Sequence, residues 1–93
     1  MKRDHNFEKR TLGDEVFLLP VGEAAQHVNG MLALLGTAEY VWDHIEETKS
    51  MEDLVNQVAS HYGQNPGDIA KEIVDFVVQL VNMGLFRPES QQW

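Results

Sequence analysis

The chain contains no cysteine, which excludes disulfide bonds, iron–sulfur ligation, thiolate zinc sites and a cysteine nucleophile. It also lacks any apolar run near the roughly 18 to 20 residues of a membrane-spanning helix, and its polar first six residues lack the apolar stretch of a signal peptide. Only three prolines and seven glycines occur in 93 residues, so collagen-like and low-complexity chains are excluded. We therefore expect a soluble, cytoplasmic protein with one domain at residues 1–88 and a loose C-terminal tail at 89–93.

Basic residues are scarce as well. Seven lysines and arginines stand against fifteen aspartates and glutamates, which gives a formal charge of −8. Four of the seven bases fall within the first ten residues, so the remainder of the chain is more acidic still. Because nucleic-acid-binding proteins gain most of their affinity from lysine and arginine contacts with phosphate, this charge argues against DNA, RNA and anionic membranes as partners.

The first third of the chain has the pattern of a small sheet. Extended segments at 6–12 and 15–21 flank Gly13-Asp14, which predicts a β-hairpin. A polar connection at 22–30 is compatible with one short helical turn at 23–27. The apolar residues 31–35 then predict a third strand, although a central strand or the start of the next helix fits the same pattern. If this strand lies at an edge, it carries none of the Lys, Glu or Pro residues that protect edges from pairing with another chain.

Two helices follow with clear start signals. Thr37 is a plausible N-cap for a helix that extends to about Glu47, and Ser50 opens a second helix in a sequence close to a capping box, which Gly63 ends. The apolar stripe of the first helix comprises Ala38, Val41, Trp42 and Ile45. The inner face of the second comprises Leu54, Val55, Val58, Ala59 and Tyr62. Trp42 is therefore expected in the core, and Tyr40, which lies off the stripe, is expected to be partly exposed.

A third helix begins at Asn65, with Pro66 at its first position, and ends near Gly84. Three strands followed by three helices predict an α+β fold. The expected core stripe of this helix is Ile69, Ile73, Phe76 and Leu80. A further apolar flank, formed by Ala70, Val74, Val77, Val78 and Val81, widens the apolar arc to about 200°.

Something must cover that flank. Strands, the first helix or a second copy of the chain would do so, and a groove that binds a peptide is the other interpretation. An extended peptide between an exposed third strand and this flank would gain backbone hydrogen bonds on one side and apolar pockets on the other. The predicted peptide-binding residues are Met31, Leu32, Ala33, Leu34, Leu35, Val74, Val77, Val78 and Val81. On this arrangement, Val78→Asp should abolish peptide binding and leave the fold intact.

Signals of catalysis are absent from the sequence. The four histidines, at positions 5, 27, 44 and 61, include no pair at i, i+3 or i+4, and no HExxH pattern occurs. Adjacent acidic residues on a helix point apart, and phosphate-binding loops and serine-centred elbows are missing. We predict no catalytic residue, no metal ligand and no cofactor.

Four runs of the sequence, at 34–42, 50–55, 61–62 and 76–85, resemble the PqqD-like family. The family pattern leads from Thr-Ala to an apolar-Trp pair, then to a capped helix with Leu and Tyr, and ends with Phe-x-x-x-Leu-x-x-x-Gly-Leu. The resemblance covers roughly residues 13–86. The matching residues are Thr37, Ala38, Val41, Trp42, Leu54, Tyr62, Phe76, Leu80, Gly84 and Leu85.

The resemblance implies a winged helix-turn-helix-like domain with a three-stranded antiparallel sheet and three helices. Proteins of this kind are precursor-peptide recognition elements of pathways for ribosomally synthesised, post-translationally modified peptides. They add the leader of the precursor as a strand and present it to a modifying enzyme, often a radical-SAM enzyme, without catalysis of their own.

Two other interpretations use the same fold. A winged-helix DNA-binding regulator is opposed by charge, because the third helix offers one base, Lys71, against three acids. A homodimerising accessory subunit of an enzyme complex would use the valine flank as its interface.

Overall fold

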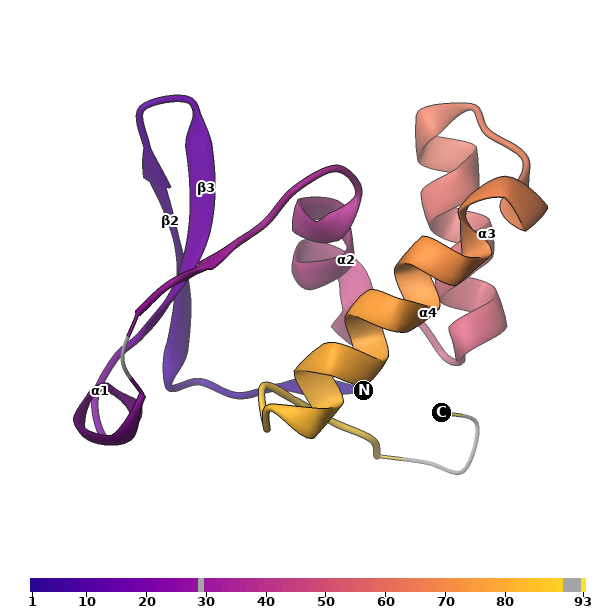
Figure 1. The fold of residues 1–93 in the computed structure, drawn as a ribbon. Helices are drawn as coiled ribbons and strands as arrows, with labels where there is room; N and C mark the ends of the chain where they lie inside the picture. The colour runs from indigo at the N-terminus through magenta and orange to yellow at the C-terminus, as the bar shows by residue number, and fades with distance from the viewer. Residues whose placement is uncertain (29, 90–92) are drawn as a thin grey trace.

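The computed structural model describes residues 1–28, 30–89 and 93, and it has the expected α+β architecture (Figure 1). A three-stranded antiparallel sheet has the order β2-β3-β4. Figure 1 shows the β2–β3 hairpin on one side of the molecule, α3 and α4 on the other, and α2 between them. The strands of this sheet are β2 (Phe7–Leu12), β3 (Glu15–Pro20) and β4 (Leu32–Ala33).

The hairpin is the one predicted from the sequence. β2 and β3 pair from Phe7 opposite Pro20 to Leu12 opposite Glu15. The turn residue Gly13 has a φ of 64°, a conformation that glycine adopts without steric cost. Leu18 points into the core, whereas the half of β2 next to the turn is exposed, so the hairpin extends beyond the helices.

The helices also follow the predicted boundaries. Ser50 accepts a hydrogen bond from the backbone N–H of Asp53 (3.1 Å), and Asn65 accepts one from Gly67 N (3.1 Å), so both act as N-caps. Thr37 occupies the N-cap position of α2 without a side-chain capping bond. The helices are α1 (Ala24–His27), α2 (Ala38–His44), which continues as the 3₁₀ helix η1 (Ile45–Glu47), α3 (Met51–Tyr62) and α4 (Pro66–Asn82).

A second, two-stranded sheet was not predicted. β1 (Lys2–Arg3) pairs antiparallel with β5 (Phe86–Arg87), and Asp4 N donates to the carbonyl of Leu85 (2.8 Å). Strands of two residues have no periodicity to detect, and this pairing joins positions more than eighty residues apart. The basic start of the chain is therefore partly a strand.

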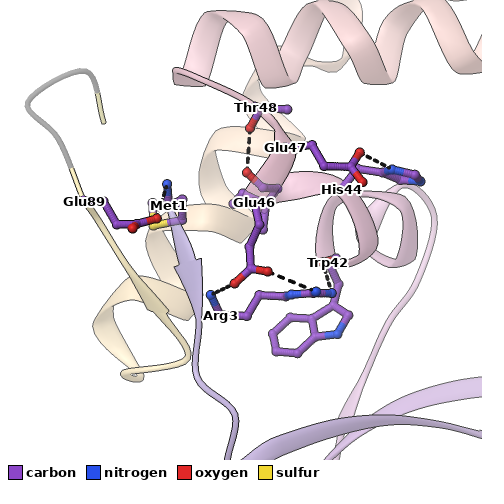
Figure 2. A network of polar contacts seen from close by, with 9 residues as sticks. Met1, Arg3, Trp42, His44, Glu46, Glu47, Thr48 and Glu89 are labelled. Carbon is purple, nitrogen blue, oxygen red and sulfur yellow. Dashed lines mark hydrogen bonds and ion pairs between the residues drawn. The ribbon is translucent and has the colours of Figure 1, made fainter.

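Arg3 fixes β1 to the helices (Figure 2). Its guanidinium donates to Glu46 Oε1 (3.2 Å) and to the carbonyl of Trp42 (3.0 Å), and lies 5.6 Å from the Trp42 ring centroid. Its backbone N–H donates to Glu46 Oε2 (2.9 Å). This backbone hydrogen bond, followed by the charge of Arg3, lowers the pKa of Glu46 below its ordinary value, while partial burial acts in the opposite direction.

The core lies where α2, α3 and α4 meet the sheets. All four predicted stripe residues of the first helix are buried, and Trp42 stacks on Phe86 at 5.5 Å between ring centroids. Two predictions were wrong. Tyr62, expected on the inner face of α3, is 42% exposed, because it is the last residue of that helix and packs edge-on against His61 instead. Val77, expected on the flank of α4, is a core residue.

Tyr40 is half-buried, as predicted. Its ring stacks on His61 with a centroid distance of 4.3 Å and contacts His44 in a tilted arrangement at 4.2 Å. No helix in residues 1–28 and 30–89 is long and apolar enough to cross a membrane.

The loose tail predicted at 89–93 falls mostly on residues 90–92, which lie outside the described residues.

Candidate functional site

Among the described residues, β4 is an edge strand with one unpaired side. It pairs with β3 in the register Leu18 to Leu32 and Phe17 to Ala33, and Leu34 N donates to the carbonyl of Val16 (2.8 Å). Along an antiparallel pair of strands, residue pairs that exchange backbone hydrogen bonds alternate with pairs that do not. Leu32 and Leu34 belong to bonded pairs, so their N–H and C=O groups point toward β3. Ala33 therefore directs its N–H and C=O to the open side. Of the alternatives that the sequence left open for residues 31–35, the structure has the edge strand, which is shorter than predicted and comprises Leu32–Ala33.

Side chains along this segment alternate in the way a strand requires. Leu34 is buried and Leu32 is half-buried against the core, whereas Met31 and Leu35 are 54% and 73% exposed. The Leu34 side chain, predicted to contact the peptide, is thus part of the core. Only the backbone and the alternate side chains of residues 31–35 remain accessible.

The second wall of the site is α4, which runs antiparallel to the β4 segment. At one end, Glu72 Oε1 lies 3.0 Å from the position that a Cβ on Gly36 would take. At the other end, Met83 lines the same pocket as Met31 and Leu32. From residue 72 to 83 a helix rises about 16 Å, and a chain extended from residue 31 to residue 36 spans at most about the same distance. The two walls therefore match in length.

We call the surface between residues 31–36 and the α4 residues Glu72, Gln79 and Met83 the β4–α4 cleft. Its hollowed part is a pocket of about 150 Å³ at the end where β4 begins. It is formed by the base of the hairpin, by the residues that lead into β4, and by the residues that follow α4. None of the described residues that line it carries a titratable side chain. They are Phe7, Leu18, Pro20, Val28, Gly30, Met31, Leu32, Met83 and Leu85. Because an engineered apolar cavity of about 150 Å³ holds benzene, this pocket is large enough for one aromatic or branched side chain.

The valines predicted as the α4 wall lie elsewhere. At about 100° per residue, positions 72, 79 and 83 fall within an arc of about 40°, and this stripe faces β4. Positions 74, 78 and 81 lie about 120° to 180° away from residue 72. Val81 packs against the core and Val74 is half-buried. Val78 is exposed in a shallow hollow that is also lined by Asp75, Gln79, Asn82 and Met83. None of the four predicted valines lines the pocket described above, and Val78 meets Met83 only in the shallow hollow on the solvent side of α4.

Met83 is the wall residue that sequence reasoning missed. It directly follows the last residue of α4, outside the apolar stripe and flank named from the sequence. Eleven residues after Glu72, however, the helix has returned to the same face. Its side chain is 48% exposed. Four of the seven exposed large hydrophobic side chains of the described residues lie around this cleft, namely Val28, Met31, Leu35 and Met83.

The arrangement offers backbone hydrogen bonds, an apolar pocket and one carboxylate. Within residues 1–28, 30–89 and 93, no three His, Asp or Glu side chains are placed to hold a metal ion. Such a site is suited to binding an extended chain.

The family described as coenzyme PQQ synthesis protein D, PqqD, matches residues 15–85. The chain belongs to the PqqD family. The match confirms the resemblance inferred from the sequence, and it runs from the start of β3 through β4 and α4 to Leu85, so it includes both walls of the cleft. β1, β2 and β5 fall outside the region matched to PqqD. No curated protein and no solved structure matches the chain.

Proposed function

We propose that this PqqD-family protein binds the leader segment of a precursor peptide as an added strand on β4. The bound leader is presented to a peptide-modifying enzyme, in pathways of this kind often a radical-SAM enzyme. The protein itself contributes no catalytic group and needs no cofactor.

The observation that carries the proposal is the open side of Ala33 in the cleft that ends at Met83. A strand paired with Ala33 would continue the β2-β3-β4 sheet, and every second side chain of that strand would face α4. One of these side chains would enter the apolar pocket. Main-chain pairing supplies affinity for any extended peptide, and the pocket supplies selectivity.

The size of the site sets the expected strength of binding. A few backbone hydrogen bonds and one or two buried side chains correspond to a small interface, for which a micromolar to sub-micromolar dissociation constant is expected. Such affinity allows the leader to be released after the modifying enzyme has acted.

The charges of α4 oppose the DNA-binding alternative. Lys71, the only base on this helix, pairs with Asp75 (2.9 Å), and Asp68 and Glu72 add further negative charge. A recognition helix needs Arg, Lys or Asn free to contact bases and phosphates.

The test is an NMR titration of the ¹⁵N-labelled protein with the leader segment of a short precursor peptide encoded beside it. Duplex DNA at the same concentration is the control. We expect chemical-shift changes at residues 31–36 and at Glu72, Gln79 and Met83. Shifts with DNA and none with the leader would overturn the proposal, and so would leader-induced shifts confined to α3 or to Val78.

A further inference from the structure

The two ends of the β4–α4 cleft differ in chemistry. The end near Met31 and Met83 is an apolar pocket without a titratable side chain. The end near Gly36 carries the Glu72 carboxylate. An extended segment in this cleft therefore meets an apolar site at one end and a negative charge at the other.

Glu72 is the carboxylate available for a ligand at that end. Asp75, one turn further along α4, is held by Lys71 at 2.9 Å. Glu72 takes part in none of the ion pairs among the described residues, and its side chain is exposed. The overall charge of −8 adds attraction for a cationic ligand.

Strand geometry relates the two ends. The pocket reaches Leu32, and Glu72 lies against Gly36, four residues further along the β4 segment. Four residues of strand cover about 13 Å. Side chains four residues apart on an added strand share one face, so one residue can fill the pocket while the other faces Glu72.

We propose that the cleft selects an extended segment with a large apolar side chain and a lysine or arginine four residues apart. Glu72 is the residue that sets the preference for positive charge. This inference rests on the proposed strand addition and adds the chemical class of the peptide to it. Opposite charge at this position favours correct partners, and an acidic residue there is rejected by like-charge repulsion.

The test uses short fluorescent peptides with a polar, uncharged background, and binding is followed by anisotropy at low salt. Phe and Arg are placed four residues apart in both chain orders, because the direction of the added strand follows from the order that binds more tightly. In that order, Arg is replaced by Gln and by Glu. A further peptide moves Arg to three residues from Phe, on the opposite face of the strand.

We expect the Arg peptide to bind about fivefold more tightly than the Glu peptide, as an exposed ion pair gained in one case and a repulsion in the other would give. Moving Arg to the opposite face should remove the advantage. Glu72→Lys should reverse the preference, whereas Glu52→Lys, an equal change of charge on exposed α3 surface, should leave it in place.

The possible failures are distinct. Arg, Gln and Glu peptides that bind within about twofold of one another, with shifts at Ala33 and Met83, would overturn the charge preference and leave strand addition standing. A preference that Glu72→Lys and Glu52→Lys weaken equally would overturn the role of Glu72. No binding by any Phe-containing peptide would count against both the inference and the function on which it rests.

Discussion

The Glu72 carboxylate of α4 lies over Gly36, with Oε1 3.0 Å from the position that a Cβ at residue 36 would occupy. Gly36 has a φ of 60°, a left-handed conformation, and turns the chain from β4 into α2. The same glycine thus turns the chain three residues after the edge strand and leaves room for the Glu72 carboxylate. This contact fixes one end of the cleft, and the pocket shared by Met31 and Met83 fixes the other.

The position of Met83 predicts which face of α4 binds a peptide. Met83→Asp places a charge in the mouth of the apolar pocket, and we expect the leader to bind at least tenfold more weakly, because a carboxylate there is desolvated without a partner. The measurement is titration calorimetry, with the midpoint of urea unfolding as the check on folding.

Val78→Asp is the matched control for that variant. It adds the same charge to an exposed side chain of the same helix, about 140° from Met83, and should leave the affinity within about twofold. The sequence alone predicts loss of binding for this variant. If Val78→Asp weakens binding and Met83→Asp does not, the valine flank is the binding surface and the cleft described here is not.

Val77 and Val78 are adjacent but should differ in their effect on stability. Val77 is 1% exposed and Val78 is 47% exposed. Val77→Ala removes buried methyl groups and leaves a cavity, so the free energy of unfolding should fall by about 2 kcal/mol, whereas Val78→Ala should change it by less than about 0.5 kcal/mol. Urea unfolding followed by circular dichroism measures both. Equal losses would contradict the assignment of Val77 to the core.

Local signals were sufficient to predict most of the fold. Gly13-Asp14 between two extended runs predicts the hairpin, and Ser50, Gly63 and Asn65 mark helix ends that the structure confirms as caps. These features depend on residues close in sequence. The family pattern is carried largely by the same structural positions, which is why it agrees with the fold.

The candidate site was predicted only in part, and the reason is physical. The composition of residues 31–35 allows an edge strand without establishing it, and which face of α4 meets that edge depends on how the helix packs against α3 and β5. The sequence shows that the apolar arc of α4 is wide, but not which part of that arc packs against the rest of the protein. Val77 is buried in the core and Val81 packs against it, whereas the exposed Met83 lines the cleft.

The pKa of Glu46 predicts a pH-dependent contribution of β1 to stability. Because the backbone N–H and the charge of Arg3 lower this pKa in the folded state, the contribution is present above the unfolded-state value and is lost as the pH falls through the folded-state value. The ordinary value is 4.5, so the loss should occur below that pH.

Glu46→Gln isolates this contribution. The variant should unfold at lower urea concentration than the wild type at pH 7, and the difference should shrink as the pH is lowered to about 3. Other carboxylates titrate in both proteins and cancel in the comparison. A difference that stays constant over this range would show that the charge of Glu46 is not what stabilises the contact with Arg3.

The most direct measurement is amide hydrogen exchange at Ala33, with and without the leader peptide. In the free protein this N–H faces the open side of β4 and should exchange rapidly, whereas Leu34 N–H, bonded to Val16, should be protected. The account predicts that a saturating leader protects Ala33 strongly and changes Leu34 much less. A leader that binds with full affinity while Ala33 continues to exchange at its free rate would contradict strand addition at β4.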